Sequence, residues 1–124
     1  MTTLWLLLAV LAAPPPPQAD AGARAFQRCA ACHALRSDDE AAPRLGDVFG
    51  RRAGAIPGFA YSDAMKAAGR RGVVWNAPTL ERFLADPDAV VPGTTMPYQG
   101  GSAAERTALI DWLRRSNEPS RNRL

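Results

Sequence analysis

The sequence predicts an all-α protein, a single small domain whose few helices are joined by long loops. Four segments have the composition or the end residues of helices, and no run of alternating apolar and polar residues predicts a strand. The 124 residues include 11 Pro and 10 Gly but only three Trp, two Tyr and four Phe. Turns are therefore abundant and large core side chains scarce, and such a domain usually needs a disulfide, a metal or a cofactor to be stable.

The N-terminus has the pattern of an export signal. Leu4–Ala13 is a short apolar run followed by four prolines, and Ala19 and Ala21 have the spacing of a signal peptidase site. The run is too short to cross a bilayer as a helix. We therefore expect residues 1–21 to be a signal peptide, although no Lys or Arg precedes the run. An uncleaved membrane anchor or a wrongly placed start is the alternative.

The first helix is expected over Gly22–Leu35, where Ala, Arg, Gln and Leu dominate and Phe26 and Ala30 share one face. The next stretch, Arg36–Phe59, has few helix signals and is interrupted by Pro and Gly. A loop of this length is unusual inside a compact domain unless it wraps around something.

Two short helices are expected in the middle of the chain. Ser62 can cap a helix over Asp63–Ala68, which Gly69 would end in the C′ position. The other should begin near Pro78, a good first-turn residue, and continue until Pro87 stops it.

The last helix has the clearest start, because Ser102 and Glu105 have the spacing of a capping box. An apolar stripe follows it, formed by Leu109, Ile110, Trp112 and Leu113. Basic residues near the C-terminus have no aromatic residues between them, so a nucleic-acid partner is not expected. We interpret them as a solvated helix end followed by a flexible tail over residues 117–124.

Residues 29–33, CAACH, contain both cysteines and the only histidine of the chain. A zinc site would need a fourth ligand, and adjacent Cys and His side chains rarely reach one metal together. A redox-active dithiol normally follows a strand in a βαβ unit, which this sequence lacks. Covalent haem attachment fits better, because Cys29 and Cys32 on one helix face can both bond one porphyrin and His33 can ligate its iron. We therefore predict one covalently bound haem c.

A second axial ligand is expected from a methionine. Met65 lies in a predicted helix, where an ordinary packing role is the better interpretation. Met96 lies in a segment rich in Pro and Gly, VPGTTMPYQGG, which cannot form a regular helix. We expect His33 and Met96 to be the iron ligands, and His/Met ligation suits electron transfer because it leaves no open site.

The sequence resembles class I cytochrome c, the family of mitochondrial-like and soluble bacterial proteins. The likeness runs from Gly22 to Leu113 and rests on six blocks in family order: GARAFQRCAACH, PRLGDVFGRRAG, PGFAYSDAM, VVWNAPTLERFLADP, VPGTTM and ERTALIDWL. It implies a single cytochrome c-type domain over residues 22–116, with three to five helices and long loops wrapped around one haem.

The resemblance also implies a role for each matching residue. Cys29 and Cys32 would carry the thioether bonds, His33 and Met96 would be the axial ligands, and the Pro43 carbonyl would accept a hydrogen bond from the proximal imidazole. Four residues would hydrogen-bond or neutralise the haem propionates, namely Arg51, Tyr61, Trp75 and Thr94. Four others would form the crossing of the first and last helices without a chemical role, namely Gly22, Phe26, Leu109 and Trp112.

Three residues depart from the family pattern and make the distal side more apolar. Phe83 replaces a Tyr that hydrogen-bonds the methionine sulfur in many relatives, Met65 replaces an Asn, and Ala42 replaces the Gly before Pro43. The ring of lysines around the exposed haem edge is also reduced. Arg28 keeps one of those charges, whereas uncharged or acidic residues stand at the others: Asp88, Ala89, Thr95, Ser102 and Ala103.

The resemblance implies a carrier of single electrons in the periplasm, not an enzyme. Its partners would be redox proteins: a quinol-oxidising complex, a terminal oxidase or a dehydrogenase. The alternative is a dedicated haem c subunit of a periplasmic dehydrogenase or oxidase. We expect a monomer, soluble or peripheral to the membrane, that docks through a nearly neutral, apolar face beside Pro97 and Tyr98.

Overall fold

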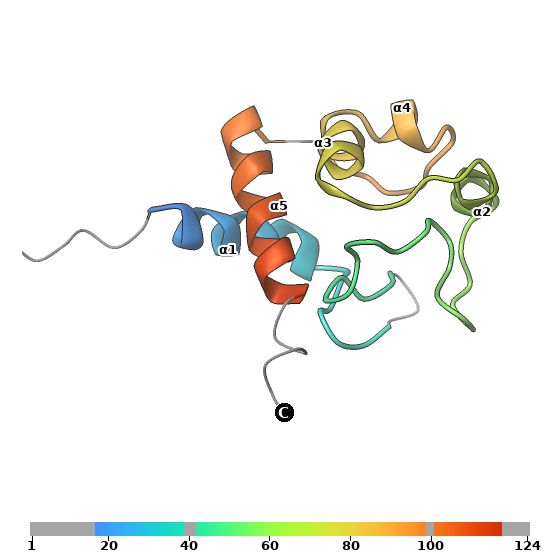
Figure 1. Ribbon diagram of the computed structural model, residues 1–124, viewed down its shortest axis with the longest axis horizontal. Helices are drawn as coiled ribbons and strands as arrows, with labels where there is room; N and C mark the ends of the chain where they lie inside the picture. Colours follow the sequence, from blue (N-terminus) through green and yellow to red (C-terminus); the bar gives the residue numbers. More distant parts are fainter. Residues whose placement is uncertain (1–16, 39–41, 99–100, 118–124) are drawn as a thin grey trace, which may run out of the picture.

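The computed structural model describes residues 17–38, 42–98 and 101–117, and within these ranges the protein is all-α, as predicted. Figure 1 shows helices α1 and α5 on one side of the molecule and the three shorter helices on the other. The described residues contain no strand, only an isolated bridge between Arg52 and Val74. The five helices are α1 (Pro17–Ala30), α2 (Asp63–Arg70), α3 (Ala77–Ala85), α4 (Pro87–Val90) and α5 (Ala103–Asn117).

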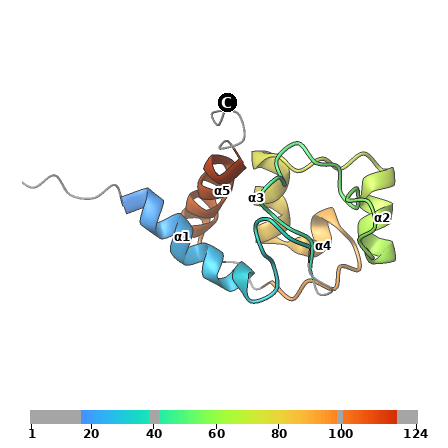
Figure 2. The same ribbon diagram turned by 90° about the horizontal axis from the view of Figure 1, so that it is seen from below.

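Helices α1 and α5 cross and pack against each other (Figure 2). Gly22 is buried at the crossing, where an added Cβ would lie only 2.5 Å from the Ala108 carbonyl oxygen and from the Trp112 Cβ. The Phe26 and Trp112 rings pack with centroids 4.7 Å apart, and Leu109 is only 1% exposed. These residues make the helix crossing that the sequence predicted.

Helix α1 begins and ends earlier than expected, at Pro17 and Ala30 rather than Gly22 and Leu35. The amides of Cys32 and His33 both donate to the Cys29 carbonyl, which closes the last turn. Beyond the helix, the carbonyls of Ala34 and Leu35 accept from the amides of Leu45 and Gly46. Cys32 and His33 therefore lie just beyond the helix, and the expectation that the whole motif is helical was wrong.

The predicted leader and tail lie mostly outside the described residues. Cleavage after Ala21 would remove Pro17–Ala21 from helix α1. At the other end, Asn117 is the last residue of α5, and its side-chain oxygen accepts from the Phe49 amide at 3.3 Å. Among the residues that the structure describes, no helix is long and apolar enough to cross a membrane.

Helix α2 confirms one predicted end and corrects the other. The Ser62 hydroxyl accepts from the Met65 amide at 3.2 Å, which is the expected N-cap. Gly69 does not end the helix, which continues to Arg70. Instead, Gly69 is buried where an added Cβ would collide with the Ala53 carbonyl, and Gly72 takes the left-handed conformation, with φ +88°.

The predicted starts of α3 and α5 are confirmed. Asn76 and Thr79 form a reciprocal capping box at α3, with Pro78 in the first turn, and Ser102 accepts from the Glu105 amide at α5. Pro87 ends α3 but also begins the short helix α4, which the sequence did not predict.

The long loop between α1 and α2 is held against the segment that precedes α3. Gly50 donates to the Trp75 carbonyl at 2.7 Å, Trp75 donates to the Arg51 carbonyl at 2.9 Å, and Ala53 donates to Val73 at 2.9 Å. These bonds place Arg51 and Trp75 next to each other, although neither belongs to a helix.

Candidate functional site

A cavity of about 320 Å³ lies between the helices and the long loop. Its size is within the range of ordinary ligand sites, about 300–1,000 Å³. Most of its wall is apolar. All nine residues that the sequence singled out for the cofactor line this cavity: Cys29, Cys32, His33, Pro43, Arg51, Tyr61, Trp75, Thr94 and Met96.

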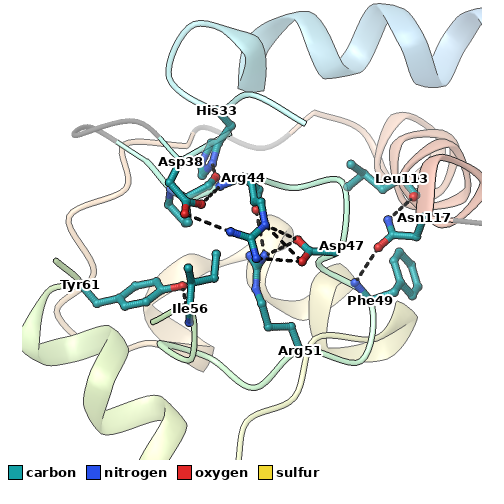
Figure 3. Close-up of polar contacts among 11 residues, drawn as sticks. His33, Asp38, Arg44, Asp47, Phe49, Arg51, Ile56, Tyr61, Leu113 and Asn117 are labelled. Carbon is teal, nitrogen blue, oxygen red and sulfur yellow. Dashed lines mark hydrogen bonds and ion pairs between the residues drawn. The ribbon is translucent and has the colours of Figure 1, made fainter. Parts of the chain in front are cut away.

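The imidazole of His33 is oriented by a hydrogen bond to the backbone. Its Nδ1 donates to the Pro43 carbonyl at 2.7 Å, the contact expected from the sequence (Figure 3). This bond fixes the ring and its tautomer and leaves Nε2 available to bind a metal. The pKa of His33 is lowered, mainly because the imidazole is buried. The hydrogen bond to Pro43 raises this pKa, and the charge of Arg51 lowers it. The imidazole is therefore neutral near pH 7, as a metal ligand must be.

The segment that carries the Pro43 carbonyl is itself fixed to the residues that follow His33. Leu45 and Gly46 donate to the carbonyls of Ala34 and Leu35 at 2.9 and 2.7 Å. The approach is so close that a Cβ at Gly46 would collide with the Leu35 carbonyl. The sequence analysis did not assign this role to Gly46, and the glycine itself was the only local sign of it.

The two cysteines lie in the cavity wall as free thiols. Cys29 is half-buried in the last turn of α1, and burial raises its pKa to about 11 in spite of the neighbouring Arg28 charge. In the described part of the chain, no three His, Cys, Asp or Glu side chains group closely enough to hold a metal ion. The geometry therefore favours bonding to an organic group over a zinc site.

Both candidate methionines line the cavity, from different elements. Met96 lies in the segment after α4, where its amide donates to the Thr94 hydroxyl at 3.3 Å and its carbonyl accepts from Tyr98 at 3.0 Å. Met65 projects from α2. The structure thus brings both methionines to one cavity, in agreement with the resemblance, which placed Met65 on the distal side of the haem.

The polar residues of the wall are held by backbone contacts. The Tyr61 hydroxyl accepts from the Ile56 amide at 3.2 Å and still has its own proton to donate. Trp75 is buried with its ring 5.0 Å from that of Phe83. Arg51 and Thr94 are half-buried.

Much of the cavity wall consists of apolar residues for which no site role was predicted from the sequence. Leu109, assigned to helix packing alone, also lines the cavity. In a sequence, a leucine that faces a cofactor has the same helical spacing as one that faces another helix. The apolar residues missed in this way are Leu45, Val48, Leu80, Leu84 and Leu113.

The residues present fit a haem group. Two thiols and an imidazole come from one short segment, thioethers are available in the same cavity, and the remaining wall is mainly apolar. Polar side chains at Arg51, Tyr61 and Thr94 can receive anionic groups. This donor set matches covalent attachment and axial ligation of a porphyrin.

Comparisons with known proteins agree with this fit. The family model for cytochrome c matches residues 19–117. The chain is 42% identical over 86 residues to a cytochrome c2 of Agrobacterium tumefaciens, covering 68% of this chain and 78% of the relative. It is 44% identical over 102 residues to a cytochrome c of Tetrahymena pyriformis, covering 81% and 90%.

Solved structures show the same likeness. Cytochrome cH from Methylobacterium extorquens superposes with a TM-score of 0.70 at 36% identity, covering 78% of this chain and 97% of that one. Ferricytochrome c2 from Rhodopseudomonas palustris gives 0.71 at 29% identity, covering 78% and 96%. The chain therefore belongs to the cytochrome c family, whose members carry one covalently attached haem c and transfer electrons rather than catalyse a reaction of their own.

Proposed function

We propose that this cytochrome c carries single electrons between exported redox proteins of the periplasm, with a haem bonded to Cys29 and Cys32 and ligated by His33 and Met96. The observation that supports this most is that the two thiols, the imidazole and the Met96 thioether all line one cavity. When bound, the haem supplies a one-electron iron couple.

Residues of the cavity wall would orient the axial ligands of the haem iron. Pro43 holds the imidazole of His33 in the ligating orientation, and the turn around Thr94 and Met96 presents a thioether. If His33 and Met96 both bind the iron, the haem would have no open position for small ligands. The apolar wall keeps water away, so the protein changes its charge by one electron with little rearrangement.

The haem-loaded protein should titrate as a single one-electron centre and should not bind carbon monoxide when reduced at neutral pH. The physical reason is that Met96 occupies the sixth position. The Met96→Ala variant is the control, because opening that position should allow carbon monoxide to bind. Immediate binding to the wild-type protein, seen as a shift of its Soret band, would instead favour a ligand-sensing protein.

We expect the face that contains the cavity mouth to be close to neutral. Arg28, which keeps one charge of the family's basic ring, is paired with Glu105 at 3.3 Å. Thr95, Pro97 and Tyr98 line the same mouth without charge. We expect the redox partner to meet this face mainly through apolar contact.

Electron-transfer rates with the native partner should therefore change only a few-fold between low and physiological salt, because salt screens charge pairs and not apolar contacts. Stopped-flow kinetics over that range would measure this. Glu105→Gln, which leaves the Arg28 charge uncompensated, should make the dependence steeper towards an acidic partner. A fall of two orders of magnitude for the wild type would contradict a neutral docking face.

A further inference from the structure

Three ion pairs connect four charged residues beside the cavity, in the order Asp38, Arg44, Asp47 and Arg51 (Figure 3). Asp47 is the carboxylate that bridges the two arginines. It accepts from Arg44 Nε at 3.2 Å and Nη2 at 3.1 Å, and from Arg51 Nη1 at 2.9 Å. Arg44 reaches Asp38 as well, at 3.0 Å.

Arg51 is the member of this chain that belongs to the cavity wall. Its side chain is 12% exposed, less than any other arginine in an ion pair among the described residues. Its Nη1 also donates to the Arg44 carbonyl at 2.9 Å, so two acceptors fix one edge of the guanidinium. Arg51 and His33 line the same cavity.

A guanidinium removed from water needs a counter-charge, and interactions at such sites are stronger than at the open surface. Asp47 supplies that charge, and its own side chain remains 54% exposed to solvent. Salt bridges between fully exposed residues contribute little. The Asp47–Arg51 pair differs because Arg51 lines the cavity. Removing this pair should therefore change the electrostatic potential at the site and have only a weak effect on the free energy of unfolding.

We propose that Asp47 is a positioning residue of the haem site, which holds the Arg51 guanidinium in the cavity wall and offsets its charge, and thereby lowers the reduction potential. Reduction adds one electron to the site and lowers its charge by one. A nearby cation favours the reduced form, and a carboxylate paired with that cation cancels part of this preference. This inference rests on the proposed function only in that the cavity holds the haem.

The test is the reduction potential of haem-loaded Asp47→Asn, measured by spectroelectrochemical titration. The variant should favour the reduced form by about threefold to tenfold over the wild type, and a tenfold change corresponds to about 59 mV for one electron. Asp47→Glu should return most of the way to the wild-type value, because it keeps the carboxylate.

A matched control is available on helix α5. Asp111 also bridges two arginines, Arg114 and Arg115, and their hydrogen bonds and charges hold its pKa below the usual range, so Asp111→Asn removes one negative charge at neutral pH. Asp111 does not line the cavity. Its variant should leave the potential nearly unchanged. Equal shifts in both variants would show a general effect of net charge and overturn the proposal.

A double-mutant cycle tests whether Asp47 acts through Arg51. In an Arg51→Gln background, Asp47→Asn should shift the potential much less than in the wild type. An equal shift in both backgrounds, or no shift in the wild type, would overturn the inference while the haem-loaded protein still behaved as an electron carrier. Failure to bind haem covalently in the wild type would overturn the proposed function itself.

Discussion

A chain that cannot attach haem, carrying Cys29→Ala and Cys32→Ala, is expected to lose its cooperative thermal unfolding transition. Without haem, the apolar lining of the cavity has no partner atoms. On the scale found for closed cavities in protein cores, a volume of about 320 Å³ corresponds to about 8 kcal/mol, which is an upper value here because the cavity is partly open to solvent. That is comparable with the whole free energy of unfolding of a small domain, about 5–15 kcal/mol.

The expected loss is uneven along the chain. Helices α1 and α5 bury Phe26 and Leu109 against each other and can keep some helical structure. The loop over residues 42–59 has only four buried apolar residues, Ala42, Val48, Ala53 and Ile56, and two of them are alanines, so it depends on the cofactor for packing.

Circular dichroism during a thermal scan would measure both parts of this prediction. The wild-type chain produced without haem is the matched control, and it should be as disordered as the double variant if the substitutions act only by preventing attachment. A double variant with native helical content and a cooperative melt would show that the protein part folds on its own.

Replacing Met96 by Ala is expected to abolish the near-infrared charge-transfer band of methionine-ligated ferric haem and to lower the reduction potential. Loss of the thioether removes the ligand that favours the ferrous state. The fall should be on the order of 100 mV or more, since axial ligands span about 0.8 V. Near-infrared absorption and a redox titration would measure the two effects.

Met65→Leu is the matched comparison because Met65 also lines the cavity. Leucine conserves most of the volume of methionine, so this change should cost less than about 1.5 kcal/mol of stability and leave the band in place. The reverse pattern, with the band lost only in the Met65 variant, would assign the ligand to helix α2.

Residues 29–33 gave the chemistry from sequence alone, because both thiols and the imidazole are neighbours in the chain. Helix starts were equally local: Ser62 and Ser102 each bond an amide three residues ahead. The resemblance to cytochrome c also implied the α1–α5 crossing at Gly22 and Phe26, which share one side of a helix.

Only the tertiary structure decided the features that join distant segments. The loop residues Leu45 and Gly46 bond the carbonyls of Ala34 and Leu35, just beyond α1, and α5 is joined to that loop through Asn117 and Phe49. The same holds for the position of Arg51, which becomes a cavity residue when its backbone pairs with Trp75. A local pattern records which residues can begin a helix or bond a porphyrin. Which backbone groups and charges meet across the fold depends on packing that no short segment contains.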